Sequence, residues 1–400
     1  MSIQFSLAAN YDMDLIPELG KFPVHEVYGK LPSDFIGGGR PSYMGTPLDK
    51  NLLKSYCEEL HNTGIEFNYL LNSSCLGNKE WGKRWQKKFM SMMTGLQEMG
   101  IKRVTVSIPY LMEIIKKRFP EFHVRVGIFA QIDTPSRARF WEDLGADVIT
   151  LESYSINRDF ERLSSIRKTV SCELQLIANH VCLPNCAMQP YHQTGFAHSS
   201  DGSRRLFIDK CILDCARKRL DEPALFLKSA WIRPEDLKKY HEMGYNSFKL
   251  LERGLPSSEL LKRVKAYSAG KFDGDLGELL LSYGFKEGPK KEWLWGLRHF
   301  FRPGQVSPAA LFPIVSLAKQ QGMMFAQDLS PVKIDNRSIP SDFLEKVSSC
   351  SGIMNGCGEC HYCDDLAQTV VEVDETFRKK SLQMFDEVKE KLTTGCLWNV

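Results

Sequence analysis

The sequence predicts an α/β fold: a (β/α)8, TIM-barrel-like domain over residues 1–270, followed by a C-terminal cysteine-rich accessory region over residues 271–400. Three observations predict it. A helix–glycine–strand unit occurs four times, eight or nine β-rich runs have helical patterns between them, and the pattern changes past residue 270. A barrel of alternating strands and helices reaches ~250 residues as one domain, so a chain of 400 residues has room for a barrel and an appendage.

The repeated unit ends a helical stretch, places a glycine and begins a strand. It surrounds Gly64 in EELHNTGIEFNYLL, Gly100 in GLQEMGIKRVTVS, Gly145 in FWEDLGADVITLE and Gly244 in KYHEMGYNSFKLL. Glycine just past a helix end adopts the left-handed conformation at little cost, and the β-rich run that follows begins a new strand of a parallel sheet. An open doubly wound sheet is the alternative, but no G-x-G-x-x-G follows the first strand. The predicted strands are 4–9, 25–30, 65–71, 103–108, 124–130, 147–152, 173–179, 224–230 and 247–251.

The composition is typical of a soluble globular chain, with 43% hydrophobic and 25% charged residues. A net charge of +3 gives no strong general attraction to nucleic acid or to an anionic membrane. The first residues lack the pattern of a signal peptide, and no run approaches the ~18 apolar residues of a membrane span. We therefore expect a cytoplasmic protein without a membrane partner. Twelve cysteines in a reducing compartment indicate metal or redox chemistry rather than disulfides.

Polar residues at the predicted strand ends are the candidates for chemistry, because barrel enzymes work on the loops that leave the carboxyl ends of their strands. Cys75 lies at such an end and is a candidate nucleophile whose partner histidine the sequence does not identify; a thiol without a catalytic role is the alternative. No H-E-x-x-H and no G-x-S-x-G is present. The residues expected to contact substrate are Asn72, Gln131 and Asn179, with Arg40, Glu152 and His192 as guesses for catalytic roles.

A first group of cysteines follows the predicted strand at 173–179. Its members are two pairs with x3 spacing, 24 residues apart: Cys182, Cys186, Cys211 and Cys215. Four thiolates can enclose a [4Fe–4S] cluster or a tetrahedral zinc ion. Structural zinc sites usually have C-x2-C knuckles, so the x3 spacing at a barrel rim favours iron–sulfur over zinc or no metal. His192 and His198 are alternative ligands, although a histidine near such a loop more often binds substrate or makes hydrogen bonds.

A second group lies in the stretch CSGIMNGCGECHYC. Its members are Cys350, Cys357, Cys360 and Cys363. C-x2-C-x2-C with a fourth cysteine nearby recurs in iron–sulfur proteins, because a tight turn can aim three thiolates at one cluster. Zinc is the alternative, with cysteines or His361 as ligands, and an unligated group is the third interpretation. Two clusters would let electrons pass between them, which suits redox chemistry better than proteolysis.

Five stretches of the predicted barrel resemble the U32 group, the collagenase-like peptidases. They are GIEFNYLLNSSCLGNKE, IKRVTVSIPYLMEIIKKRFP, LGADVITLESYSINRDFERLSSI, LQLIANHVCLPNC and SAWIRPEDLKKYHEMGYNSFKLLERG, in the family's order. The resemblance implies a barrel that holds a [4Fe–4S] cluster on four cysteines. It maps the ligands onto the first cysteine group, although the first pair is more widely separated in many members. It also implies oxygen-independent hydroxylation, of a ubiquinone precursor or of RNA bases; the peptidase name is the older one.

We therefore expect an iron–sulfur enzyme that performs oxygen-independent hydroxylation or related redox chemistry on an organic, RNA or peptide substrate, with an electron-donor protein as partner. A U32-type peptidase or peptide-modifying enzyme is the first alternative. A zinc-stabilised RNA-binding module is the second, since residues 289–302 interleave basic and aromatic side chains. The same pattern is expected of a helix that packs onto a barrel, so nucleic acid is the weaker interpretation of that stretch.

Overall fold

A computed structural model describes residues 2–41, 48–203, 206–252, 255–280, 300–302, 304–320, 330–350, 357 and 360–398, without the side chains of 316–320. The chain divides by its internal contacts into two compact units. Unit 1 comprises Met1–His180, Gln189–Arg204 and Ala230–Phe272, and unit 2 comprises Val181–Met188, Arg205–Ser229 and Asp273–Val400. The boundary after Phe272 lies close to the predicted one at 270. Two segments of the predicted barrel domain, 181–188 and 205–229, instead group with the C-terminal residues.

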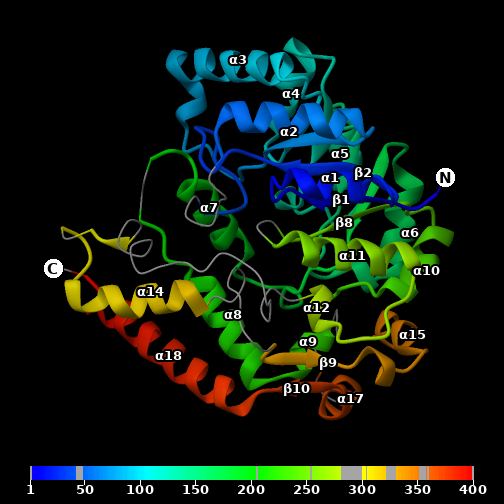
Figure 1. Ribbon diagram of the computed structural model, residues 1–400, viewed down its shortest axis with the longest axis vertical. Helices are drawn as coiled ribbons and strands as arrows, with labels where there is room; N and C mark the ends of the chain where they lie inside the picture. Colours follow the sequence, from blue (N-terminus) through cyan, green and yellow to red (C-terminus); the bar gives the residue numbers. More distant parts are fainter. Residues whose placement is uncertain are drawn as a thin grey trace. The chain divides into compact units, whose positions relative to one another are not determined.

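Unit 1 contains a closed barrel of eight parallel strands, in which β8 pairs back onto β1 (Figure 1). The strands are β1 (Gln4–Ala8), β2 (Val24–Gly29), β3 (Glu66–Leu71), β4 (Arg103–Val106), β5 (His123–Val126), β6 (Val148–Thr150), β7 (Glu173–Ile177) and β8 (Ser247–Leu250). The predicted TIM-barrel-like fold is confirmed. The four glycines of the repeated unit have φ values between 76° and 97°, in the left-handed region that the helix–glycine–strand pattern requires.

Helices alternate with the strands of the barrel and bury one face. In α3, for example, Phe89, Met93 and Leu96 are buried at helical spacing while the positions between them are exposed or half-buried. The helices of unit 1 are α1 (Ile16–Leu19), α2 (Lys50–Asn62), α3 (Lys83–Glu98), α4 (Pro109–Arg118), α5 (Pro135–Asp143), α6 (Phe160–Thr169), α7 (Gln189–Ser199), α10 (Leu237–Glu242) and α11 (Ser257–Ala269). Short 3-10 turns occupy Met13–Leu15, Lys79–Trp81, Ile128–Ala130, Ile156–Arg158 and Pro234–Asp236.

The strand predicted at 224–230 is wrong. The segment is a short helix, α9 (Ala224–Lys228), and it belongs to unit 2. Four of its five residues are buried, so the helix has no polar face to mark a 3.6-residue period. Short apolar runs of this kind cannot be assigned to helix or strand from periodicity alone.

The interior of the barrel is polar where β2 to β5 meet. Glu26 and Arg125, whose side chains are fully buried, form an ion pair. Asn68 Nδ2 donates a hydrogen bond to Glu26 Oε2 at 3.1 Å, and Thr105 Oγ1 donates to Asn68 Oδ1 at 2.7 Å. Burial raises the pKa of Glu26, but the charge of Arg125 and the hydrogen bonds outweigh it and lower the pKa to about 2. One side chain from each of four successive strands therefore belongs to a single network.

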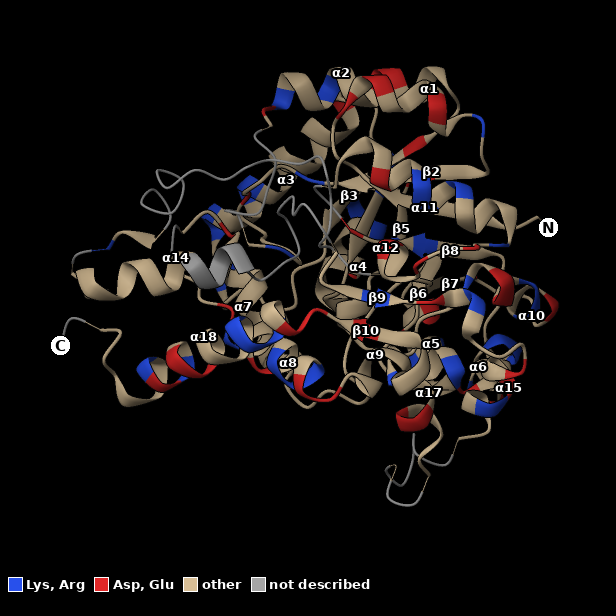
Figure 2. Cartoon of the chain, turned by 60° about the horizontal axis from the view of Figure 1, so that its bottom comes forward, with Lys and Arg blue, Asp and Glu red and all other residues tan. Residues whose placement is uncertain are grey.

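Unit 2 is built mainly from helices. Its longest, α18, is amphipathic as predicted for 374–393 and packs on α8, where Arg217 Nε lies 2.6 Å from Asp386 Oδ1 and Lys389 Nζ lies 3.0 Å from Asp214 Oδ1. Both helices carry mixed charges (Figure 2). Besides α9, the elements of unit 2 are α8 (Lys210–Asp221), α12 (Gly277–Leu280), α14 (Leu311–Gln320), α15 (Phe343–Ser348), α17 (Tyr362–Val370), α18 (Glu375–Thr394), 3-10 turns at Pro308–Ala310 and Asn336–Ser338, and the antiparallel strands β9 (Val332–Ile334) and β10 (Val371–Val373). Among the residues described in either unit, no helix is long and apolar enough to cross a membrane.

Replacing Arg125 by methionine tests the interior ion pair. The substitution leaves the Glu26 carboxylate buried without its cation, so we expect the free energy of unfolding to fall by about 3–5 kcal/mol, measured by urea denaturation. The matched control is Lys21→Met, which removes the exposed Lys21–Glu18 pair and should leave the unfolding midpoint unchanged. An equal change in the free energy of unfolding for the two variants would contradict a stabilising role of the buried Glu26–Arg125 pair.

The same pair sets a pH dependence. The pKa of Glu26 is lower in the folded chain than in the unfolded one, so its contribution to stability is fully present above the unfolded value, about 4.3, and is lost as the pH falls toward about 2. We expect Arg125→Met to reduce the acid sensitivity of unfolding over that window, measured as the slope of stability against pH.

Candidate functional site

The loops at the carboxyl ends of the barrel strands hold the residues that the sequence predicts for substrate contact or catalysis. Two of these residues are occupied in structural contacts. Asn179 joins the ends of β7 and β8, because its Nδ2 donates to the Leu251 carbonyl and its Oδ1 accepts from the Leu251 N–H, both at 2.7 Å. Arg40 forms an ion pair with Glu252 after β8. These contacts hold the strand ends together.

Glu152 organises the loop after β6. Its carboxylate accepts backbone hydrogen bonds from Tyr154, Ser155 and Ile156 and one from the Ser155 hydroxyl at 2.9 Å. Burial raises the pKa of Glu152, and these hydrogen bonds only partly oppose that shift. These contacts give the Glu152 carboxylate a structural role in the loop after β6.

Gln131 lies beside α7. Its Nε2 donates to Gln193 Oε1 at 3.2 Å, and Gln193 in turn donates to the Tyr154 hydroxyl at 3.2 Å. His192, on the same helix, packs its ring against Phe196 with the centroids 4.2 Å apart. The loops after β5 and β6 are therefore linked to α7 by amide side chains.

Two polar side chains at the ends of neighbouring strands have atoms without a hydrogen-bond partner in the described part of the chain. They are Asn72 Oδ1, after β3, and Ser107 Oγ, after β4. Ser107 is 7% exposed, and both side chains flank Gly127, where an added Cβ would lie 3.1 Å from Ser107 Oγ and 3.6 Å from Asn72 Cβ. Unpaired buried polar atoms are rare, so these two are available to a bound ligand.

The three glycines at 37–39 lie close to other parts of the barrel mouth. Asp34 Oδ1 accepts the N–H groups of Ile36 and Gly37, both at 3.0 Å, and Lys30 Nζ donates to the Gly37 carbonyl at 2.6 Å. A Cβ at Gly37 would lie 2.1 Å from the carbonyl oxygen of Ala197 in α7. The loop requires glycine because it packs on the backbone of α7.

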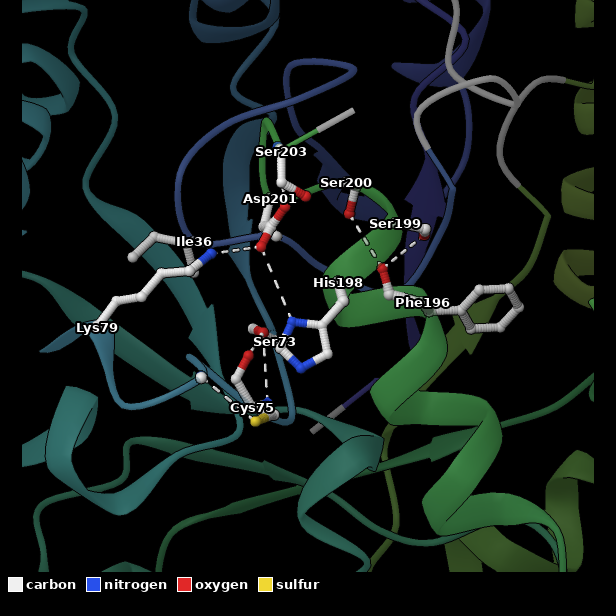
Figure 3. Close-up of polar contacts among 12 residues, drawn as sticks. Ile36, Ser73, Cys75, Lys79, Phe196, His198, Ser199, Ser200, Asp201 and Ser203 are labelled. Atoms are coloured by element: carbon white, nitrogen blue, oxygen red, sulfur yellow. Dashed lines mark hydrogen bonds and ion pairs between the residues drawn. The ribbon is translucent and has the colours of Figure 1, made fainter. Parts of the chain in front are cut away.

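The structure also supplies a histidine beside Cys75, which sequence reasoning could not do. Gly77 N–H donates to Cys75 Sγ at 3.4 Å, and a Cβ at Gly77 would lie 3.5 Å from His198 Cε1. His198 Nδ1 lies 3.8 Å from Asp201 Oδ2, and Lys79 Nζ lies 2.6 Å from the same oxygen (Figure 3). His198 and Asp201 are far from Cys75 in the sequence, and no local pattern joins them.

The eight grouped cysteines all belong to unit 2. In the first group, Arg219 of α8 connects the two segments. Its Nη1 donates to the Val181 carbonyl at 2.6 Å, next to Cys182, and its Nη2 donates to Cys215 Sγ at 3.5 Å. The segment 181–188 and helix α8 therefore lie side by side.

The thiols of this group affect one another electrostatically. Burial, together with the charges of Asp209, Cys215 and Cys186, raises the pKa of Cys211 to about 12. Burial also raises the pKa of Cys215, against the lowering effect of Arg219. Three of the four predicted ligands thus interact with one another.

The second group lies beside α9. Lys228 Nζ is 2.9 Å and 3.0 Å from the two carboxylate oxygens of Asp364 in α17. Burial lowers the pKa of Lys228, but the hydrogen bond and charge of Asp364 and the charges of Cys357 and Cys363 outweigh it and raise the pKa. Residues 351–356 and 358–359 lie outside the described residues, as do residues 289–299 of the predicted basic and aromatic stretch.

The donor type and number of both groups fit an iron–sulfur cluster or zinc, since thiolates are the ligands that these metals prefer. Among the described residues, however, no group of three or more His, Cys, Asp or Glu side chains is arranged so that it could hold a metal ion. Rotation about χ1 moves each Sγ between three staggered positions. The fit of the first group to a metal therefore depends on the proximity of its two segments, 181–188 and α8, which Arg219 joins.

Comparison with known proteins adds one sequence relative. No family model matches the chain. A protein of Methanocaldococcus jannaschii described as an uncharacterized protease is 29% identical over 350 residues, which cover 87% of this chain and 89% of that protein. A solved U32 peptidase is 20% identical, covers 64% of this chain and 94% of its own, and has a TM-score of 0.48. The 3-hexulose-6-phosphate synthase of Salmonella typhimurium is 12% identical, covers 67% and 98%, and has a TM-score of 0.35.

The closed parallel barrel with polar strand ends and an added cysteine-rich unit defines the chain as an α/β-barrel protein with an accessory thiol domain. The sequence match extends over most of both chains. The similarity to a protein described as a protease supports the resemblance to the U32 group that the motifs predict.

Replacing Gly37 by alanine tests the packing of the glycine loop on α7. Its φ of 77° and the 2.1 Å approach to the Ala197 carbonyl both disfavour a side chain, so we expect the free energy of unfolding to fall by at least about 1–3 kcal/mol, measured by urea denaturation. Gly95→Ala is the matched control, because Gly95 lies inside α3 with nothing within 4 Å of its Cβ position. It should raise the free energy by about 0.5–1 kcal/mol. A Gly37→Ala variant as stable as the wild type would contradict the packing.

Proposed function

We propose that the chain is an iron–sulfur enzyme that performs oxygen-independent hydroxylation or a related redox modification of an organic, RNA or peptide substrate. Cys182, Cys186, Cys211 and Cys215 would hold a [4Fe–4S] cluster. The observation that carries the proposal is the Arg219 bridge, which brings the backbone next to Cys182 and the Cys215 thiol to one guanidinium. The described cysteines of both groups form no disulfide, which is consistent with a role as ligands.

When bound, the cluster supplies single electrons for the redox step. The residues of the chain would set its surroundings. Arg219 places a fixed positive charge against Cys215, and a cation beside thiolates offsets part of their combined negative charge. Lys228, held by Asp364, would act in the same way on the second cysteine group, which is proposed to hold a further cluster or zinc.

The substrate would bind at the carboxyl ends of the barrel strands, as in other barrels. Asn72 and Ser107 offer unpaired polar atoms there, and Gln131 offers an amide. A neutral polar lining of this kind suits hydrogen bonds to an uncharged group of the substrate. A reducing compartment such as the cytoplasm and an electron-donor protein are part of the proposal.

Metal analysis tests the proposal. After anaerobic purification we expect about four iron and four sulfide per chain, or about eight of each if both groups hold clusters. The double variant Cys211→Ser with Cys215→Ser should lose about four iron, because serine oxygen is a poor ligand for the cluster. The measurement is iron and sulfide counting with absorption spectra.

The control for this experiment is Cys396→Ser, an exposed cysteine of unit 2 outside both groups, which should keep the full iron content. Zinc without iron in the wild-type protein would overturn the proposal.

Hydrolysis of peptide bonds is the second candidate function. It is favoured by the description of the Methanocaldococcus relative as a protease. Release of new amines from a peptide by protein freed of metal would support it, and retention of that activity in the variant with Cys211→Ser and Cys215→Ser would separate it from the iron–sulfur proposal.

A further inference from the structure

The geometry points to a thiol acyl-transfer centre in unit 1, in which Cys75 is the nucleophile and His198 is the base that accepts its proton. Asp201 and Lys79 are positioning residues. The centre would take the carbonyl group of an amide or ester, a peptide bond being the amide that proteins offer most often. This inference rests on the second candidate function, hydrolysis of peptide bonds, and names the residues that would perform it. It is independent of the iron–sulfur proposal.

Cys75 lies in the short loop that leaves the carboxyl end of β3, where barrel enzymes carry their chemistry. The loop holds the residue firmly. Ser73 Oγ donates to the Cys75 carbonyl at 2.8 Å, and Cys75 N–H donates back to Ser73 Oγ at 3.4 Å. The N–H of Gly77 donates to Cys75 Sγ at 3.4 Å, and a donor to sulfur stabilises the thiolate relative to the thiol.

The histidine comes from the end of α7. Figure 3 draws the His198 ring between the Asp201 carboxylate and the Cys75 side chain. The contacts of Gly77 place the two functional groups together, since this one glycine lies against both the sulfur and the imidazole. His198 is 25% exposed at the side chain and Cys75 is half-buried, so both are accessible to a small molecule.

The carboxylate that faces His198 is itself held in place. Asp201 Oδ2 is 3.8 Å from His198 Nδ1 and 2.6 Å from Lys79 Nζ, and Asp201 Oδ1 accepts the N–H of Ser203 at 2.9 Å. Burial raises the pKa of Asp201, but the bonds from Lys79 and Ser203 outweigh it and lower the pKa. Asp201 is therefore a carboxylate at neutral pH whose Oδ2 faces His198 Nδ1, and in the proposed centre Nε2 is the nitrogen that accepts the proton.

The backbone beneath His198 is fixed by the glycine loop. Gly37 packs on the carbonyl of Ala197, the residue before His198, and Asp34 N–H donates to the Ser200 carbonyl at 3.3 Å. These contacts place the end of α7 against the loop after β2. A catalytic pair needs this kind of rigid support, because small displacements remove most of the rate gain.

Cys75 differs from the structural thiols of the same unit. Cys57 is 7% exposed, and burial raises its pKa to about 12, which keeps it protonated. Cys172 has its pKa raised to about 12 by burial and by Glu142. Cys75, by contrast, accepts the Gly77 N–H and lies beside the His198 ring (Figure 3).

The proposed step balances without an added oxidant or reductant. The sulfur of Cys75 forms a bond to the substrate carbonyl carbon while His198 Nε2 takes the thiol proton, and the carbonyl electron pair moves to oxygen. Collapse of the tetrahedral intermediate breaks the bond from carbon to the leaving nitrogen or oxygen, which receives the proton from His198. Water then attacks the thioester with His198 as base, releasing the carboxylic acid and the free thiol.

The experiment uses p-nitrophenyl acetate as acyl donor and iodoacetamide as alkylating agent on the full-length protein as purified. We expect a burst of about one nitrophenolate per chain and an acetyl group on Cys75, located by mass spectrometry of peptides. Cys75→Ala should abolish the burst. His198→Gln should slow acylation at least about tenfold and remove the inflection of the rate against pH between about 5 and 8. Lys79→Met and Asp201→Asn should shift that inflection without abolishing the burst, a change that a purely structural role would not cause.

The control is Cys396→Ser, which should keep the burst of the wild type. Alkylation of Cys75 no faster than that of Cys396, with the same rate in His198→Gln, would overturn the inference. Loss of iron on Cys75→Ala would also overturn it, because Cys75 would then be a metal ligand. If His198→Gln does not fold, as judged by circular dichroism, the alkylation of Cys75 in the wild-type protein is measured against pH instead. An inflection between about 5 and 8 supports the inference, and a profile without it overturns the inference. Acylation of Cys75 without cleavage of any peptide would refute the peptidase function and leave the centre in place.

Discussion

The buried ion pair between Glu26 and Arg125 is the constraint on which the rest of the barrel depends. The two residues lie on β2 and β5, which are not neighbours in the sheet, and neither side chain has exposed surface. A buried charge without its partner is strongly destabilising. The closed barrel must therefore hold β2 and β5 at the spacing and register at which Glu26 and Arg125 meet. Because side chains alternate across a strand, a slip of one residue would turn either charge away from the interior. The positions of the strand ends, and of the loops that leave them, follow from this register.

The positions of the eight strands were predictable because the information for them is local. A glycine in the left-handed region ends each helix of the repeated unit, and a β-rich run follows it directly. The polar interior was not predictable, because an arginine in the strand HVRV has the sequence pattern of a solvent-facing residue. Its burial depends on Glu26, a residue 99 positions away. The same limit explains the error at 224–230, where an apolar run gave no period by which helix and strand could be distinguished.

The candidate site shows the same division between local and distant information. The sequence places Asn179 and Cys75 just after strand ends, and the structure agrees with these positions. Their partners are set by closure of the barrel. Asn179 binds Leu251 across 72 positions, and Cys75 meets a histidine from a helix that follows β7. A single sequence shows which residue types lie at strand ends, but it does not show which of them are in contact. Those contacts distinguish a structural amide or ion pair from a reactive thiol.

The two uses proposed for cysteine in this chain require opposite surroundings, and the structure provides both. In the first group Cys211 is buried and the other three cysteines are half-buried. Burial and the charges of neighbouring thiols raise the pKa of Cys211 and Cys215, so that a cation is needed before they can be deprotonated together. Cys75 belongs to unit 1, with the Gly77 N–H on its sulfur and the His198 imidazole beside it. There a single thiol can ionise by passing its proton to His198. Since Lys79 already offsets the charge of Asp201, the carboxylate orients the imidazole without having to accept the proton itself.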